Sequence, residues 1–489
     1  MRSHRRRGPG PFGFLGIALA LTSPVLAVAQ DGKVPITTKS EEARQHYLKG
    51  RDLFERLRAT DAHEQFQKAA AADKDFALAQ LGLANTAPSA KDFFDALKQA
   101  TSLVSKASEG ERHLILAADA GVRGDGAGQK SHIDQLTAAF PQDERALNTL
   151  GAFHFGRQEY EQAIAAYQKA IVLNPGFSQP YNQMGYALRF IGRNDEAEKA
   201  FKKYIELIPD DPNPYDSYAE LLMKLGRFDE SIKSYEKALS VNNHFVASYL
   251  GIGLDQIYLG QSAKARETFA RLEQVARNTG EKRAAYAQTA FSYIEEGNTA
   301  EAVKQVEKMK AVAKQEGDTV SLSGDALFLG NIYLEAGRPD EAKAQFAESL
   351  KLAEAASTPP DVKEAARRQD LFDVARVALA KGDLAGAKAK SDAYAAAVAQ
   401  RKIPFEVRQS HELAGMVALQ EKDYAKAVAE LTQANQLDPR VQYHLARAYQ
   451  GKGDLKAARE TAKLAAEHNG LNFNYAYVRG KARQLLAQI

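Results

Sequence analysis

Apolar and small residues recur along the middle of the chain with a period of 34 residues. A bulky residue stands at the start of each copy, at Leu147, Tyr181, Tyr215 and Tyr249. A small residue follows four positions later, at Gly151, Gly185, Ala219 and Gly253. A second small residue and then an aromatic one keep the same period, at Ala163 and Tyr167, Ala197 and Phe201, Ser231 and Tyr235, and Ala265 and Phe269. A period of this length is typical of stacked structural repeats.

Within one copy, the apolar positions have helical spacing. Tyr181, Gly185 and Leu188 fall at i, i+4 and i+7, which predicts a first helix with one apolar face. A turn at Gly192 follows, and the positions from Ala197 to Phe201 predict a second helix with its own apolar face. Because one helix pair of this size cannot bury both faces alone, each copy needs its neighbours. The pattern therefore predicts an all-α solenoid of antiparallel helix pairs.

This block resembles the tetratricopeptide repeat family, in a secreted bacterial form. The resemblance is carried by the pair of small residues, the aromatic residue between the helices and the closing prolines at Pro141, Pro175 and Pro209. The family's tryptophan is replaced here by Leu or Tyr, which conserves bulk. The resemblance implies a right-handed superhelix whose first helices line a concave groove, and we expect a capping helix at its C-terminal end.

The strength of the repeat pattern varies along the chain. It is regular in the middle, irregular before it and longer after it, where Gly297, Gly337 and Gly382 still indicate turns. We interpret Pro359-Pro360 and Pro404 as hinges or longer loops between repeats. The expected organisation is a signal peptide (1–29), a flexible leader (30–40), irregular helix pairs (41–141), the regular 34-residue block (142–277), longer divergent helix pairs (278–466) and a capping helix (467–489).

The first 29 residues predict export. Four arginines between positions 2 and 7 precede an apolar run from Phe12 to Leu26. Ala27-Val28-Ala29 then has the small residues of a cleavage site after Ala29. The alternative is an uncleaved anchor, although the apolar run is short for a membrane span. We therefore expect a periplasmic or secreted protein that does not insert into the membrane after cleavage.

Net charge and the absence of cysteine limit the classes of partner and of chemistry that the chain can have. Removing residues 1–29 takes away four arginines and no acidic residue, so the formal charge falls from +3 to −1. A nearly neutral chain with interleaved charges gives no electrostatic argument for nucleic acid as a partner. The sequence contains no cysteine, which excludes disulfides, thiol nucleophiles and covalent haem attachment.

No motif in the sequence predicts catalysis, a cofactor or a metal site. Gly124–Ser131 resembles a phosphate loop, but Gln129 occupies the place of its second glycine, and a predicted helix precedes it instead of a strand. The histidines are scattered and do not have the spacing of metal ligands. We therefore interpret the chain as a non-enzyme.

The resemblance also implies where a partner would bind. The matching inner positions of the first helices are Asn148, Asn182, Tyr186, Arg189, Asp216, Glu220 and Lys224. Asparagines one repeat apart can pair with a peptide backbone without demanding a sequence, and the charged residues would set a preference for side chains. The alternative is that these side chains form only a solvated inner surface.

The sequence therefore favours a non-catalytic scaffold or adaptor of the cell envelope that binds a protein or peptide segment in the groove. One alternative is an enzyme with a site between the irregular N-terminal repeats, around acidic residues and His113 or His132. Another is a structural spacer in an envelope complex. Fold alone is a weak guide among these functions, and the oligomeric state does not follow from the pattern.

Overall fold

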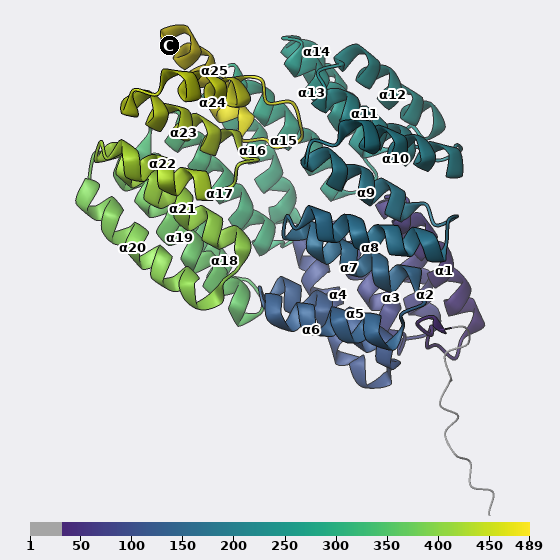
Figure 1. The fold of residues 1–489 in the computed structure, drawn as a ribbon. Helices are drawn as coiled ribbons and strands as arrows, with labels where there is room; N and C mark the ends of the chain where they lie inside the picture. Colours follow the sequence, from purple (N-terminus) through teal and green to yellow (C-terminus); the bar gives the residue numbers. More distant parts are fainter. Residues whose placement is uncertain (1–31) are drawn as a thin grey trace, which may run out of the picture.

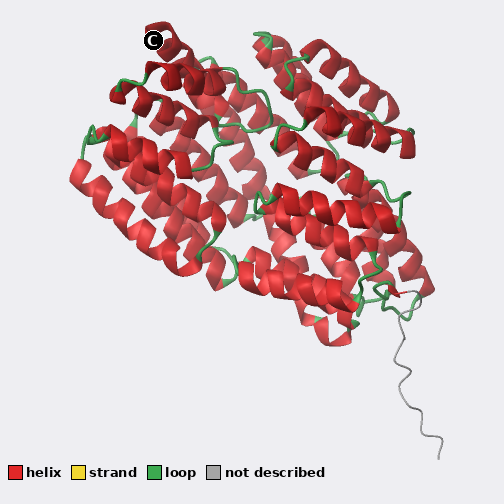
Figure 2. Cartoon of the chain, in the orientation of Figure 1, coloured by secondary structure: helices red, strands yellow, loops and turns green. Residues whose placement is uncertain are grey.

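The computed structural model describes residues 32–489, which fold into helices joined by loops (Figure 2). The predicted signal peptide and its cleavage site at Ala29 lie outside the described residues. In the described part there are 25 α-helices, one short 3₁₀ helix (η2, Val104–Lys106) and no strand. None of these helices is both long enough and apolar enough to cross a bilayer. The prediction of an all-α solenoid is confirmed.

Consecutive helices form pairs, and each pair packs on the next one along the chain. The first part comprises α1 (Glu41–Glu55), α2 (Ala59–Ala72), α3 (Ala77–Asn85), α4 (Ala90–Ser102), α5 (Glu109–Val122), α6 (Gly126–Ala139), α7 (Glu144–Gly156), α8 (Tyr160–Leu173), α9 (Gln179–Phe190), α10 (Asn194–Leu207), α11 (Asn213–Lys224), α12 (Phe228–Val241), α13 (Val246–Tyr258) and α14 (Ser262–Val275). The second part comprises α15 (Thr279–Glu295), α16 (Thr299–Gln315), α17 (Thr319–Glu335), α18 (Pro339–Ala355), α19 (Pro360–Ala380), α20 (Leu384–Arg401), α21 (Pro404–Gln420), α22 (Tyr424–Gln433), α23 (Pro439–Lys452), α24 (Leu455–Ala466) and α25 (Tyr475–Gln488).

The ladder of small and aromatic residues holds the two helices of a pair together. A Cβ atom added at Gly185 on α9 would lie 2.7 Å from the ring of Phe201 on α10, and Gly151 has the same relation to Tyr167. Phe201 is completely buried and packs edge-on against the ring of Tyr186. The small residue is therefore required because it lets the aromatic side chain of the second helix reach the backbone of the first.

Glycines in the left-handed conformation form many of the turns between paired helices. Gly192, Gly297, Gly337 and Gly382 have φ values of 78°, 74°, 73° and 76°, a region that a side chain disfavours. This confirms that these glycines form turns.

The proline-containing stretches do not interrupt the stack. Pro360 and Pro404 are the first residues of α19 and α21, where a proline costs no helical hydrogen bond. Across these loops, α18 packs on α19 and α20 packs on α21. Pro359-Pro360 and Pro404 therefore mark loops between repeats that remain packed.

The solenoid curves until distant repeats meet. In Figure 1, α9–α14 lie on the right, α17–α25 lie on the left, and α25 comes back beside α15. The α4 helix packs on α17, and the backbone N–H of Ala90 donates to Asp318 Oδ2 at 3.1 Å. Arg401, the last residue of α20, donates to the backbone oxygen of Arg123, just after α5, at 2.6 Å. We call these contacts between distant repeats the joints.

The leader, predicted to span residues 30–40, contacts the repeats along its described part. The backbone N–H of Val34 donates to Asp143 Oδ2, and that of Thr37 donates to Glu111 Oε1, both at 2.7 Å. The Val34 side chain packs against Phe140. Through these contacts, Val34 and Thr37 lie against the α5–α7 region.

Candidate ligand-binding cavity

The seven predicted groove residues lie on the first helices of three successive pairs. Asn148 is on α7, the set Asn182, Tyr186 and Arg189 is on α9, and the set Asp216, Glu220 and Lys224 is on α11. Four of them are buried, namely Asn148, Asn182, Asp216 and Glu220. An open groove would leave these four side chains exposed, but neighbouring repeats cover them.

Contacts between adjacent repeats explain this burial. Tyr186 Oη donates to Glu220 Oε1 at 2.8 Å across 34 residues, one repeat length. Asn148 Nδ2 donates to Gln179 Oε1 at 2.9 Å, and Ser248 Oγ donates to Asp216 Oδ1 at 2.7 Å. The inner polar residues therefore bond from one repeat to the next, and this use competes with binding an external peptide.

The two acidic residues on α11 are unfavourably placed for carrying charge. Burial and the nearby charge of Glu220 raise the pKa of Asp216 well above its usual range. Burial also raises the pKa of Glu220, although Arg189 opposes the shift. The Arg189 Nη1 atom lies 3.3 Å from Glu220 Oε2, and its guanidinium stacks over Tyr186, 4.8 Å from the ring centre. The acidic groups of this network are therefore bonded within the protein and are not free to contact a ligand.

The exposed end of the network opens into a cavity of about 490 Å³, which we call the inner cavity. Arg189, Phe190 and Lys224 form one wall, and residues 436–442 and 464–472 form the opposite wall. Apolar side chains line that wall and remain exposed to solvent, namely Leu437, Leu464 and Leu471. Amide side chains also line it, namely Gln436, Gln442, Asn469 and Asn472.

The inner cavity carries positive charge. Lys224 makes no hydrogen bond or ion pair with any residue in the described part of the chain. Partial burial of its ammonium group and the charge of Arg189 lower its pKa. Burial together with the charges of Lys224 and Arg479 lowers the pKa of His468 to about 4, so this imidazole is neutral at pH 7. A cavity with exposed leucines, amides and an unpaired lysine can hold an apolar side chain beside an acidic group or a backbone carbonyl.

The sequence predicts residues of one wall of this cavity but none of the opposite wall. Arg189 and Lys224 lie near the C-terminal ends of two successive first helices, which the repeat pattern predicts. Leu464 and Asn469 reach the same cavity only because the solenoid curves back on itself. No local pattern in residues 464–472 signals this contact.

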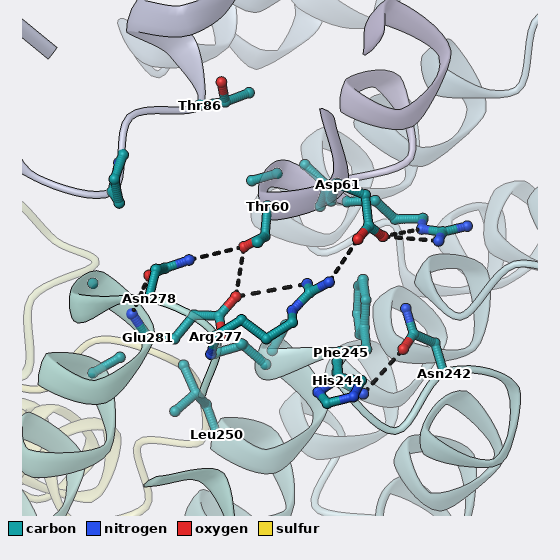
Figure 3. Close-up of a pocket in the computed structure, with 18 of the residues that line it drawn as sticks. Thr60, Asp61, Thr86, Asn242, His244, Phe245, Leu250, Arg277, Asn278 and Glu281 are labelled. Carbon is teal, nitrogen blue, oxygen red and sulfur yellow. Dashed lines mark hydrogen bonds and ion pairs between the residues drawn. The ribbon is translucent and has the colours of Figure 1, made fainter. Parts of the chain in front are cut away.

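A second cavity, of about 380 Å³, lies at a joint between the start of the chain and α15 (Figure 3). Arg277 lies between Asp61 and Glu281, with Nη1 2.6 Å from Asp61 Oδ1. Thr60 donates to Glu281 Oε1 at 2.5 Å and accepts from Asn278. These polar groups of the cavity lining are paired with one another across the joint. The cavity is therefore a weaker candidate for a ligand site than the inner cavity.

The histidines of the alternative enzyme site are in contact, but the contact recurs elsewhere. The Nδ1 atoms of His113 and His132 lie 3.2 Å apart across 19 residues. His46 pairs with Gln65 and His411 pairs with Glu430 at the same separation in sequence. The separation is therefore a regular contact within a helix pair. In residues 32–489, no three His, Cys, Asp or Glu side chains gather as a metal site.

Family models described as tetratricopeptide repeat match residues 144–177, 166–199, 213–245, 327–355, 409–441 and 439–467. The chain thus contains tetratricopeptide repeats in the regular block and beyond it, and this fold is typically non-catalytic. No curated protein matches the chain.

Several solved structures are similar to parts of the chain. MamA is 23% identical, covering 36% of this chain and 95% of its own, with a TM-score of 0.29. A tetratricopeptide repeat protein from Parabacteroides merdae ATCC 43184 is 16% identical over 54% of this chain and 99% of its own, with a TM-score of 0.36. YrrB, described as a TPR protein with an unusual peptide-binding site, is 17% identical over 37% of this chain and 91% of its own, with a TM-score of 0.26.

Proposed function

We propose that this protein is a non-catalytic scaffold of the cell envelope that binds a segment of a partner protein in the inner cavity. The fold and its repeats support a role in protein interaction. The observation that carries the proposal is the composition of the cavity, where Lys224 faces exposed leucines and amides. Such a lining suits an extended segment with an apolar side chain next to an acidic one.

The predicted groove residues have different roles. Arg189 and Lys224 contact the partner, whereas Asn148, Asn182, Asp216 and Glu220 stabilise the stack beneath the cavity. Tyr186 connects the two groups through its bond to Glu220. Substitution of Lys224 should therefore affect binding with little effect on folding.

Matched substitutions of exposed residues test this role. Leu464 lines the cavity and is 61% exposed, while Leu455 on the same helix is 52% exposed and lies outside it. Lys224 lines the cavity, and Lys233 is an exposed lysine on the next helix. We expect Leu464→Ser and Lys224→Glu to weaken partner capture, and Leu455→Ser and Lys233→Glu to leave it unchanged. An apolar contact or a charge-assisted bond lost from a partly desolvated site corresponds to about 1 to 3 kcal/mol, roughly tenfold to a hundredfold in affinity.

The measurement is cross-linking in cells and capture from envelope extract, read by quantitative mass spectrometry. The supporting result is a set of proteins retained by both control variants and lost with both cavity variants, while circular dichroism shows unchanged helicity. If all four variants retain the same proteins at wild-type levels, the inner cavity is not the binding site, and the spacer hypothesis becomes the better one.

Export is a separate part of the proposal and rests on the sequence of residues 1–29. The protein made in cells should begin at Gln30 and be recovered from the periplasm or the medium. Intact-mass and N-terminal analysis of the purified protein measure this directly. Recovery of the full-length chain from the cytoplasmic fraction alone would contradict export without affecting the binding proposal.

A further inference from the structure

The C-terminal segment (residues 467–489) does more than cap the last repeat. Its helix α25 packs on α24 and α23, as the next helix of a stack would, and it also packs on α15. Figure 1 shows α25 beside α15 and α24, where the solenoid has curved back on itself. The segment therefore also covers the first helix of an earlier pair, α15.

Aromatic side chains form the contact. Phe473 stacks on Phe291 of α15 with ring centres 4.6 Å apart and planes inclined by 14°. Tyr475 packs edge-on against Tyr258 of α13 at 5.3 Å. Phe328 of α17 packs against Phe291, with ring centres 4.8 Å apart. We call Tyr258, Phe291 and Phe328 the inner aromatic surface.

A buried arginine fixes the segment on this surface. Arg479 is 2% exposed, and its guanidinium lies between the rings of Tyr258 and Tyr475, 4.3 and 4.5 Å from their centres. Its Nη1 atom is 3.0 Å from Glu295 Oε1 on α15. Two residues further on, Lys481 pairs with Glu335 on α17 at 2.7 Å. Acidic side chains on α15 and α17 thus pair with basic side chains on the segment.

The polar atoms of this contact are incompletely paired. Arg479 Nε, Tyr475 Oη, Glu295 Oε2 and His468 Nε2 are buried and have no hydrogen-bond partner among the residues that the structure describes. A buried polar atom without a partner opposes burial. The α9–α10 pair of the repeat core has a single such atom, Asn182 Oδ1. The contact of the segment therefore buries more unpaired polar atoms than that pair does.

We propose that the C-terminal segment is a tethered occupant of the inner aromatic surface, and that a partner protein binds there by displacing it. The partner segment carries two aromatic side chains followed within about two helical turns by an arginine, because that is what Tyr258, Phe291 and Glu295 hold in this chain. Residues 468–472 of the segment also line the inner cavity, so displacement of the segment would remove part of that wall. The peptide test below reads the inner aromatic surface alone, so its result does not depend on what the inner cavity binds. Since the tether gives the segment a high effective concentration, a free competitor binds weakly until the segment is loosened.

The test uses the full chain and a fluorescent synthetic peptide of residues 467–489 as the probe. Fluorescence anisotropy should show weak binding to the wild-type chain and at least tenfold tighter binding to Arg479→Gln, in which the tethered segment has lost its ion pair. The matched control is Arg483→Gln, which changes an exposed arginine of the same helix that makes no ion pair with another described residue. This control should bind the peptide as weakly as the wild type.

Specificity of the surface is tested with a second peptide and a second chain. A peptide with Phe473→Ser and Arg479→Gln should not bind any of the chains. Adding Glu295→Gln to the Arg479→Gln chain should remove the gain in affinity. If the wild-type peptide binds none of the folded variants, or binds Arg483→Gln as tightly as Arg479→Gln, the proposal is wrong.

Hydrogen exchange of the wild-type chain is a second test, which does not require Arg479→Gln to fold. We expect the amides of residues 475–488 to exchange at least tenfold faster than those of α10, and faster again with excess unlabelled peptide, while α15 stays protected. Protection of α25 equal to that of α10, unchanged by the peptide, would overturn the proposal.

Discussion

The repeat cores and the joints hold this solenoid together in different ways. In a repeat core such as that of α9 and α10, the completely buried ring of Phe201 lies against Gly185, and the contact is apolar. At the joint of Figure 3, Arg277 pairs with Asp61 across 216 residues, and both side chains remain partly exposed. Burial of a large apolar side chain stabilises by several kcal/mol, whereas a partly exposed ion pair contributes about 0 to 1 kcal/mol.

This difference separates the stability of the solenoid from its shape. Repeat stability is approximately a sum of local terms and nearest-neighbour terms. Polar joints such as Arg277–Asp61 and Arg401–Arg123 add weak contacts between distant repeats, beside the buried aromatic contact of α25 with α15. Together these contacts fix the curvature and bring the walls of the inner cavity together. Damage to a core should therefore unfold repeats, and damage to a joint should open the molecule without unfolding it.

The largest effect is expected at a core residue. Phe201→Ala should cost about 3 to 5 kcal/mol because it leaves a cavity between α9, α10 and the next pair. The matched control is Phe405→Ala, since Phe405 is 55% exposed and should cost less than about 0.5 kcal/mol. Hydrogen exchange measured by mass spectrometry should show faster exchange in residues 180–240 for Phe201→Ala. An even increase over the whole chain would contradict the nearest-neighbour picture.

A pH-dependent effect of intermediate size is expected on the inner face of α13. Asp255 is fully buried, and neither carboxyl oxygen has a hydrogen-bond partner within the described residues. Burial raises its pKa to about 8. Between the ordinary pKa and this value, the unfolded chain releases a proton that the folded chain keeps. The free energy of unfolding should therefore fall as the pH rises from about 4 to about 8.

Asp255→Asn should remove this contribution. The stability of the variant relative to the wild type should increase by about 1 to 4 kcal/mol between pH 5 and pH 8, because each pKa unit corresponds to about 1.4 kcal/mol. Urea unfolding at several pH values, followed by circular dichroism, measures the difference. Asp229→Asn, at an exposed position of α12, serves as the control and should show no such trend. A constant difference between Asp255→Asn and wild type would contradict the raised pKa.

The sequence predicts the repeat cores because each core uses residues close in the chain. The contact between Gly185 and Phe201 follows from helical spacing and the 34-residue period, and so do the turns at Gly192 and Gly297. These features depend on local geometry that repeats in every copy, so a single sequence contains the signal several times.

The joints and the far wall of the cavity were not predictable in this way. Each repeat is rotated slightly relative to the one before it, and the contact between Arg277 and Asp61 depends on the sum of these rotations. That sum cannot be predicted from a local residue pattern. The burial of Asp216 was missed for a related reason, because its partner Ser248 lies on the neighbouring repeat. Positions of Arg189 and Lys224 were predicted, but their role in binding stays a prediction.

The smallest change in stability is expected at a joint, and it gives the sharpest comparison with a core. Arg277→Ala should cost only about 0.2 to 1 kcal/mol, because it removes a partly exposed ion pair. Its effect should nevertheless appear in two places, with faster hydrogen exchange in α2 and in α15, and with a larger radius of gyration in X-ray scattering.

Arg227→Ala is the matched control for this joint, since Arg227 pairs with Glu230 three residues away at 2.5 Å. An ion pair of the same chemical type is lost, but no distant repeat is released. Exchange should change only near α11 and α12, and the radius of gyration should stay the same. High salt should reproduce the expansion in the wild type, because it screens exposed ion pairs. If Arg277→Ala and Arg227→Ala behave alike in both measurements, the joints do not set the curvature, and the packing of neighbouring repeats alone determines the shape of the solenoid.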